Sequence, residues 1–485
     1  MTNTWDLRGG QLRFLTEKQI EEIHCAALDV LHRVGCFFEY EEALQIFEEA
    51  GAWVDRGKRV VRIPHNLVDQ ALSHTPDRVF LAARNPKYDI FLEDDRVYFG
   101  TGTVSVNVLD LDTGKLRQGT LKDCKEFPRL IDSLEYVHFF KAMIVPGDVN
   151  QKIPELYQVY SAFTNTEKQI STNAYSAKGA MDVIRMGEVI AGGMKEFRIR
   201  PLIIINVLAV SPLQWSHTNL EILMELAKLK VPMLIGAEPQ AGTTGPVTLA
   251  GHIVLNTAET LAGITLAQII SPGIPIVYGH VGSISDMRSG LFASGAVELG
   301  ILNAMSNQMA HYYKLPTYAT GGMSDAKVSD YQAGTEKALQ ALITAMSGGN
   351  YIHDAAGLLE CCMTSSYEQY VLDNEMLGMV ARVLSGVDFS RESLAIEVIR
   401  EVGPRGNFLG HMHTLRNITK EHFIPKIFNR QVREEWVKGG SKSATETARE
   451  EAKRILLTHQ PTPLSPEMDR ELQLIIKKAE ESYGR

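Results

Sequence analysis

Residues 318–340, "YATGGMSDAKVSDYQAGTEKALQ", combine a short strand, a glycine break and a helix in one stretch. The segment opens with residues that favour a buried strand, and Gly321 and Gly322 interrupt it. Apolar residues return at helical spacing after Asp330. Polar and ionisable side chains gather between strand and helix: Asp325, Lys327, Asp330, Gln332 and Glu336. A strand followed directly by a helix is the repeating unit of proteins built on a parallel sheet.

The same unit occurs eight times along the chain. The predicted strands lie within residues 96–103, 138–146, 168–176, 200–212, 231–240, 274–283, 315–322 and 350–357. Helix-period segments separate them, so the strands should be parallel. Eight such units are the number that closes a (β/α)₈, or TIM, barrel. An open doubly wound sheet is the alternative, but no G-x-G-x-x-G motif follows an early strand. We predict an α/β protein with a (β/α)₈ barrel.

The segments on either side of the barrel have a different pattern. Residues 1–94 are predicted to form an N-terminal layer of helices and short strands, in which Thr16 and Gln19 begin the first helix and Gly35 ends it. The barrel is assigned to residues 95–388. Residues 389–485 contain charge-rich amphipathic helices, which predict a C-terminal helical extension that wraps the barrel or joins a subunit contact.

Composition limits the possible functions. The chain has 485 residues, 45% hydrophobic and 22% charged, with a net charge of −9. Nucleic acid is a poor partner, because phosphate binding needs a concentrated basic patch. The N-terminus lacks the features of a secretory signal, and no charge-free apolar run reaches membrane-spanning length. We therefore expect a cytoplasmic protein that binds neither nucleic acid nor membrane.

The cysteines do not predict a disulfide framework. There are five in a long chain, Cys25, Cys36, Cys124, Cys361 and Cys362, which indicates free thiols in a reducing compartment. The adjacent pair Cys361 and Cys362 raises the alternative of a metal site with His353 as a third ligand. Their spacing matches no known zinc pattern, so no metal site is predicted.

The candidate site residues lie where predicted strands end. Parallel strands deliver their carboxyl ends to one rim of a barrel, where active sites form. Strand alternation places Tyr278 and His280 on one face, and likewise Tyr351 and His353. The complete set of candidates is Tyr98, Glu238, Tyr278, His280, Arg288, Asp325, Asp330, Gln332, Tyr351 and His353.

Each candidate also has a structural alternative. Glu238 can cap the next helix, Asp325 can cap the turn that follows it, and Asp330 fits the N-cap of the helix at 331–340. Histidines at strand ends are often structural, and aromatic side chains can belong to the core.

Aromatic rings and carboxylates on one rim favour a small cationic ligand. No zinc motif, phosphate loop or nucleophile elbow is present. A quaternary ammonium has no N–H to donate, so ring faces and nearby carboxylates are the main means of holding it. Arg288 can then hold a carboxylate at the other end of a zwitterion.

Residues 318–360, residues 363–386 ("MTSSYEQYVLDNEMLGMVARVLSG") and residues 274–313 together resemble the trimethylamine methyltransferase family. Members of this family are TIM barrels that demethylate methylated amines with a corrinoid. The trimethylamine enzymes that name the family contain pyrrolysine, whereas every residue here is ordinary. The sequence is more similar to members without pyrrolysine, which act on quaternary amines such as glycine betaine.

The resemblance implies attack by cob(I)alamin, carried by a separate corrinoid protein, on an N-methyl carbon. Glycine betaine would give dimethylglycine. Carnitine, proline betaine and γ-butyrobetaine are alternative substrates, and a quaternary-amine binding protein without chemistry is an alternative function. The corrinoid protein should dock on the rim, and a homo-oligomer is expected.

Placement on the rim predicts a role for each candidate. The expected catalytic residues are Glu238, Asp325, His280 and His353, with the two acids as counter-charges to the ammonium and the two histidines orienting the carboxylate. The expected substrate-binding residues are Tyr98, Tyr278 and Tyr351 around the ammonium, Arg288 at the carboxylate, and Asp330 and Gln332 nearby.

Overall fold

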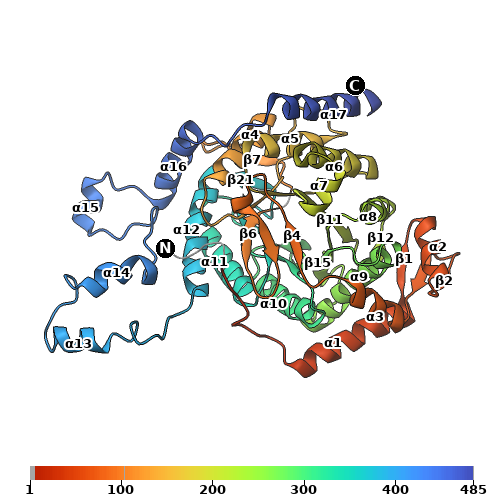
Figure 1. Ribbon diagram of the computed structural model, residues 1–485, viewed down its shortest axis with the longest axis horizontal. Helices are drawn as coiled ribbons and strands as arrows, with labels where there is room; N and C mark the ends of the chain where they lie inside the picture. The colour runs from red at the N-terminus through yellow and green to blue at the C-terminus, as the bar shows by residue number, and fades with distance from the viewer. Residues whose placement is uncertain (1–5, 103, 484–485) are drawn as a thin grey trace.

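The computed structural model describes residues 6–102 and 104–483, and its centre is a closed barrel of eight parallel strands (Figure 1). Around the barrel the order is β10-β11-β13-β15-β18-β19-β6-β9. The strands are β6 (Tyr98–Thr101), β9 (Phe139–Lys141), β10 (Gln169–Thr172), β11 (Ile203–Ala209), β13 (Met233–Ala237), β15 (Ile276–His280), β18 (Thr317–Thr320) and β19 (Tyr351–Ala356). Every one lies within a predicted strand segment, so the (β/α)₈ prediction is confirmed.

A helix follows each barrel strand and packs outside it. These helices are α4 (Leu121–Asp132), α5 (Pro154–Asn165), α6 (Ala177–Ala191) with the short α7 (Met194–Ile199), α8 (His217–Leu229), α9 (Leu249–Ile270), α10 (Val297–Tyr312), α11 (Tyr331–Met346) and α12 (Tyr367–Leu384). Among the described residues only α9 is long and apolar enough to span a membrane, and 83% of its most apolar window is buried inside the protein.

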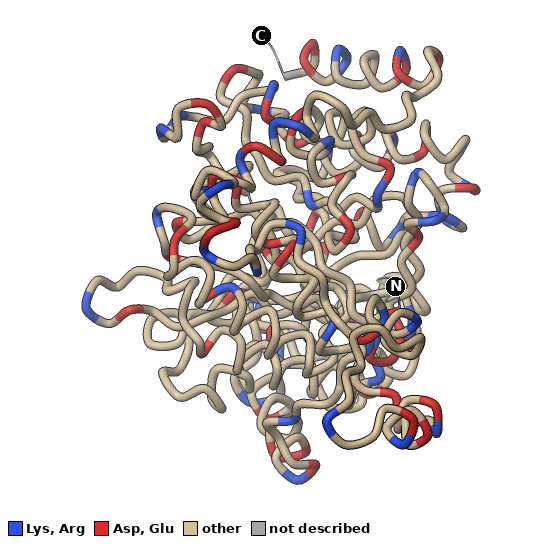
Figure 2. The backbone as a smooth tube through the Cα atoms, turned by 90° about the vertical axis from the view of Figure 1, so that its left-hand side faces the viewer, with Lys and Arg blue, Asp and Glu red and all other residues tan. Residues whose placement is uncertain are grey.

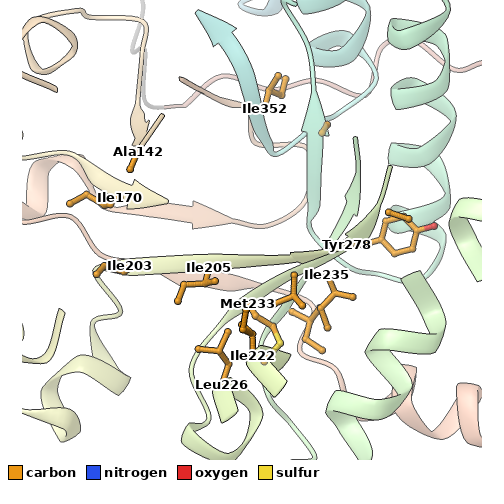
Figure 3. Packing of buried hydrophobic residues seen from close by; sticks show 14 of the residues in the cluster. Ala142, Ile170, Ile203, Ile205, Ile222, Leu226, Met233, Ile235, Tyr278 and Ile352 are labelled. Atoms are coloured by element: carbon orange, nitrogen blue, oxygen red, sulfur yellow. The ribbon is translucent and has the colours of Figure 1, made fainter. Parts of the chain in front are cut away.

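Strand alternation separates the barrel interior from the helical layer. Ile204, Leu234 and Val277 belong to the cluster inside the barrel. Their neighbours Ile203, Ile205, Met233, Ile235 and Tyr278 belong to the larger cluster outside it, in which Ile222 and Leu226 of α8 also take part (Figure 3). A side chain's direction is therefore fixed by its position in the strand.

The amino-terminal end of the barrel is closed by a hairpin. Strands β4 (Val79–Leu81) and β5 (Ile90–Leu92) pair antiparallel, with the short helix η2 (Pro86–Tyr88) between them. Their buried residues pack with Tyr98 and Phe139 of the barrel strands. Access to the interior is consequently from the opposite, carboxyl end.

The N-terminal layer covers the barrel beside α9. It contains α1 (Glu17–Asp29), η1 (Val30–Val34), β1 (Cys36–Phe38), α2 (Glu41–Glu49), β2 (Trp53–Asp55), β3 (Val60–Arg62) and α3 (His65–His74). The predicted capping box of Thr16 and Gln19 is present, and Gly35 ends the helical run with φ +80°. β1 pairs with β12 (Gln214–Trp215), which follows a barrel strand, so the layer is joined to the barrel.

Two small sheets extend the barrel at the carboxyl ends of its strands. One contains β14 (Gln240–Ala241), β16 (Ser283–Asp286) and β17 (Leu291–Ala293), and the other contains β20 (Leu358–Leu359), β21 (Thr364–Ser366), β7 (Asn107–Leu109) and β8 (Leu116–Gln118). All seven strands belong to loops that follow barrel strands, so they build walls above the barrel mouth.

The C-terminal extension consists of an arm that projects from the barrel and two helices that pack back against it. Helices α13 (Ile396–Val402), α14 (Met412–Glu421) and α15 (Arg433–Lys438) project from the barrel and have no buried residue (Figure 1). Helices α16 (Ala444–Thr458) and α17 (Pro466–Tyr483) return to it, and Arg449 pairs with Glu368 of α12 at 2.7 Å. Barrel elements thus run from Tyr98 to Leu384; the division into three domains stays a prediction.

Charge is dispersed over the molecule. Lysines and arginines lie among aspartates and glutamates in the view of Figure 2, where no block of one sign covers the chain. The net charge of −9 therefore reflects many separate acidic side chains.

Candidate active site

The acidic segment after β18 mainly holds the rim loops together. Asp325 accepts hydrogen bonds from the backbone N–H and hydroxyl of Ser294 (3.2 and 2.7 Å) and from the N–H of Gly295 (2.9 Å). Glu336 accepts from the Ser324 hydroxyl at 2.6 Å and from the Asp325 N–H at 3.0 Å. The two carboxylates therefore connect the loops that follow β17 and β18.

The other two candidates in this segment lie on α11. Asp330 is its N-cap and accepts from the N–H of Ala333 at 3.2 Å, as the capping alternative predicted. Gln332 is exposed and donates to Glu336 at 2.9 Å. The structure therefore keeps both at the start of α11 and does not bring them into the barrel interior.

Tyr278 and His280 point out of the barrel, so the expectation that they face a common interior site is wrong. The Tyr278 hydroxyl donates to Thr257 of α9 at 3.0 Å, and Nε2 of His280 lies 2.9 Å from Nε2 of His252 on the same helix. Val277 and Val281 take the inward positions of β15. The two candidates do share a face, as predicted, but it is the face that packs against helices.

Arg288 lies at the tip of the hairpin formed by β16 and β17. Its side chain is 91% exposed, and its guanidinium binds Asp286, with Nε 3.0 Å from Oδ1 and Nη2 2.7 Å from Oδ2. The structure does not bring Arg288 to the barrel interior, because the hairpin of β16 and β17 carries it outward.

Tyr98 and Tyr351 point inward, near the closed end. Each is the first residue of its strand. The Tyr351 ring stacks on Phe139 with centroids 3.6 Å apart, and its hydroxyl donates to Gln169 at 2.6 Å. The Tyr98 hydroxyl accepts from the N–H of Phe91 in the closing hairpin at 3.4 Å. These rings form the floor of the interior, below the charged groups.

His353 is the inward histidine. Its ring stacks on Tyr318 with centroids 4.1 Å apart and planes 8° apart, Nε2 lies 2.8 Å from the Thr320 hydroxyl, and Nδ1 lies 2.9 Å from Asp354. Burial lowers the pKa of His353, although the Asp354 carboxylate opposes this shift. The imidazole is therefore favoured in its neutral form.

A backbone irregularity directs Asp354 inward. The residue has φ +59°, and the pairing of β19 with β6 shifts register between Ile352 and Ala356. Its carboxylate lies against Gly102, where a Cβ would be 1.6 Å from Oδ1. Since only glycine leaves this space, Gly102, directly after β6, makes room for a fully buried acid.

Lys141 is a site residue that the sequence analysis missed. It lies two positions after the inward Phe139 on β9, and its Nζ donates to the Tyr318 hydroxyl at 2.6 Å. Burial lowers its pKa to about 8, while Asp354 and then Glu238 counteract this effect. A lysine inside an apolar strand is the signal that could have found it, since the same reasoning selected Glu238.

Glu238 directly follows β13 on the inward side of that strand. Its side chain keeps solvent-exposed surface, yet enclosure by the protein raises its pKa to about 7. Asp354 raises this pKa further and Lys141 lowers it. Glu238 is therefore exposed to solvent and at the same time coupled electrostatically to the interior charges.

The cysteine pair lies close to this region. Cys362 is buried and Cys361 is partly exposed. Burial raises the pKa of Cys361 to about 11 and also raises the pKa of Cys362, so both side chains are favoured as neutral thiols.

Together these positions define an enzyme-type (β/α)₈ barrel, closed at one end, with ionisable groups gathered inside its open end. The interior group consists of Lys141, Glu238, Tyr318, His353 and Asp354. Of the predicted site residues it contains Glu238 and His353.

Comparison with known proteins agrees with this class. The family model "Trimethylamine methyltransferase" matches residues 5–484. The chain is 34% identical over 478 residues to a trimethylamine methyltransferase of Desulfitobacterium hafniense, covering 99% of this chain and 96% of that protein. It is 32% identical over 471 residues to a glycine betaine methyltransferase of another strain of that species, covering 97% and 98%.

A solved structure gives a weaker likeness. The monomethylamine methyltransferase of Methanosarcina barkeri aligns with 93% of this chain and 95% of its own, at 11% identity and a TM-score of 0.45. The sequence matches are those that decide: the chain belongs to the trimethylamine methyltransferase family and is a methyltransferase.

Proposed function

We propose that this protein transfers an N-methyl group from a quaternary amine, with glycine betaine as the best candidate, to cob(I)alamin on a separate corrinoid protein. The observation that carries the proposal is Glu238, an accessible carboxylate at the open end of the barrel of a methyltransferase. A relative of nearly the same length is named a glycine betaine methyltransferase.

A quaternary nitrogen suits such a site. Its positive charge is permanent, so it is attracted to an ionised carboxylate without sharing a proton with it. When the methyl carbon is attacked by the cob(I)alamin cosubstrate, a cobalt–carbon bond forms and the carbon–nitrogen bond breaks. The nitrogen keeps the electron pair and leaves as a neutral tertiary amine, so the chain need not supply a proton.

The residues of this chain would act by binding and orientation. Glu238 and Asp354 offset the ammonium charge, and the stacked rings of Tyr318 and His353 form a rigid wall beside them. Rigid placement of the methyl group in line with its acceptor is a large part of the rate enhancement available to such a reaction. Asp325 contributes by holding the rim loops, and Tyr98 and Tyr351 by closing the floor.

The partner and assembly are part of the proposal. A corrinoid protein should dock on the carboxyl rim, since the hairpin of β4 and β5 closes the other end. The arm that carries α13–α15 buries no residue of its own helices and offers a surface for a homo-oligomer. A cytoplasmic location fits the five free cysteines.

Two alternatives stay open for the test. Another quaternary amine, such as carnitine, proline betaine or γ-butyrobetaine, is one, and a binding protein without chemistry is the other. The protein is incubated with free cob(I)alamin and each amine, and the absorption spectrum is followed for methylcobalamin. Methylation by one amine supports the proposal. Tight binding of an amine with no methylation by any would contradict it.

A further inference from the structure

Lys141 carries its ammonium group inside the barrel, and no described residue forms an ion pair with it. The residue is 2% exposed, and Nζ donates one hydrogen bond, to the hydroxyl of Tyr318. An ammonium has three N–H donors. Within residues 6–102 and 104–483, no carboxylate forms an ion pair with this nitrogen and no second acceptor binds it. A buried charge is costly unless an opposite charge accompanies it, so Lys141 is matched to an anionic group of a ligand.

Glu238 is the acidic counterpart of Lys141. In the described part of the chain its carboxylate makes neither an ion pair nor a hydrogen bond. Lys141 and Glu238 nevertheless affect each other's pKa, so they lie within electrostatic reach of one another. Lys141 stands two positions after the inward Phe139, and Glu238 four positions after the inward Leu234, so both charges face the same barrel interior.

We infer that Lys141 and Glu238 form a receptor for a zwitterion, with the ligand's carboxylate on Lys141 and Tyr318 and its quaternary ammonium beside Glu238. The inference rests on the proposed function and adds the group that selects the substrate's tail. It also replaces Arg288, which is bound to Asp286 on a rim hairpin, as the carboxylate ligand.

The difference in exposure sets the orientation of the ligand. Lys141 is buried, whereas Glu238 keeps exposed surface near the barrel mouth. The carboxylate end of the ligand therefore lies deeper and the N-methyl groups lie nearer the rim. This is the end from which a methyl acceptor can approach.

The arrangement predicts selection by the tail as well as by the ammonium. Choline carries the same trimethylammonium group as glycine betaine but ends in a hydroxyl. Its binding would leave Lys141 without an anion. Charge-assisted hydrogen bonds contribute about 1.5–3 kcal/mol, which corresponds to roughly 10- to 150-fold in affinity.

Calorimetric titration of the full-length protein with glycine betaine and with choline tests the inference. Wild-type protein should bind glycine betaine at least about tenfold more tightly than choline. Lys141→Met should remove that preference by weakening betaine binding alone, and Lys141→Arg should restore part of it by keeping the charge. Equal binding of both ligands by the wild-type protein would overturn the inference. This comparison does not depend on whether any variant folds.

Two further variants make the result specific. Lys228→Met makes the same exchange at an exposed lysine of α8 and should change neither affinity. Arg288→Met separates the two possible carboxylate ligands, because a selective loss of betaine binding in this variant would assign the carboxylate to Arg288 and contradict the role of Lys141. If no quaternary amine binds or methylates cob(I)alamin, the proposed function fails; if choline serves as well as glycine betaine, only the zwitterion receptor fails.

Discussion

Replacing Glu238 with glutamine should weaken the binding of quaternary amines and abolish the pH dependence of that binding. The substitution keeps size and shape but removes the charge. Two opposite unit charges about 5 Å apart attract by roughly 3 kcal/mol at an effective dielectric constant near 20. Because Glu238 is in contact with solvent, we expect about half of that value. A loss of about 1.5 kcal/mol is about a tenfold rise in Kd.

The pH profile gives a second, independent measure. A quaternary ammonium does not titrate, so any pH dependence belongs to the protein. The pKa of Glu238 is raised to about 7, hence its charge and the affinity for choline should increase as pH rises through 7. For glycine betaine the same increase should be followed by a decrease above pH 8, where Lys141 loses its proton.

Calorimetric titrations from below pH 7 to above pH 8 provide the assay. Glu238→Gln should give weaker binding with no rise through pH 7. Glu225→Gln, at an exposed acid paired with Lys228, serves as the matched control and should behave as wild type. An unchanged affinity in Glu238→Gln, or a rise in affinity through pH 7 that persists in this variant, would show that the Glu238 carboxylate does not attract the ammonium.

Three further substitutions test the supports of the site. Gly102→Ala places a Cβ 1.6 Å from the carboxylate of Asp354, so the rate of methyl transfer should fall by more than about tenfold. Activity near that of the wild type would show that methyl transfer does not depend on the position of Asp354. Lys337→Met removes the ammonium that lies 3.2 Å from the buried carboxylate of Asp373. The free energy of unfolding, measured in urea, should fall by about 3–5 kcal/mol, and a loss below about 1 kcal/mol would contradict a stabilising ion pair. Tyr278→Phe removes one outward hydrogen bond, so stability should fall by about 1 kcal/mol while KM stays unchanged, and a raised KM would return this residue to the site.

The barrel could be predicted because it depends on local pattern. Each buried strand is a short apolar run within a predicted segment, and each is followed by a segment with helical periodicity. The N-cap role of Asp330 and the capping box at Thr16 were predictable for the same reason, since both use hydrogen bonds within a few residues.

The direction in which strand side chains point, into the barrel or towards the helices, was less predictable than the fold. A parallel barrel strand is buried on both faces, so apolar residues at every position do not distinguish inside from outside. Alternation correctly paired Tyr278 with His280, but nothing in "IPIVYGHV" indicates that the valines take the inner face. The inward position of Asp354 depends on a local register shift and on a distant glycine, neither of which has a sequence signature in one chain.

The rim loops explain the remaining differences. Arg288 and Asp325 follow predicted strand ends closely, yet β16 and β17 form a hairpin that carries Arg288 outward, and Asp325 is engaged by Ser294 and Gly295. Lys141 is one lysine within the apolar segment 138–146, and its inward direction depends on the alternation of β9, which the sequence pattern does not reveal.

A crystal structure of the protein with glycine betaine bound would show whether Lys141 and Glu238 hold the two ends of the zwitterion. We expect electron density for the ligand inside the open end of the barrel, with its carboxylate hydrogen-bonded to Lys141 and its trimethylammonium group beside Glu238 and facing the rim. Density in another place, such as the hairpin at Arg288, or the reverse orientation with the methyl groups against Lys141, would contradict it.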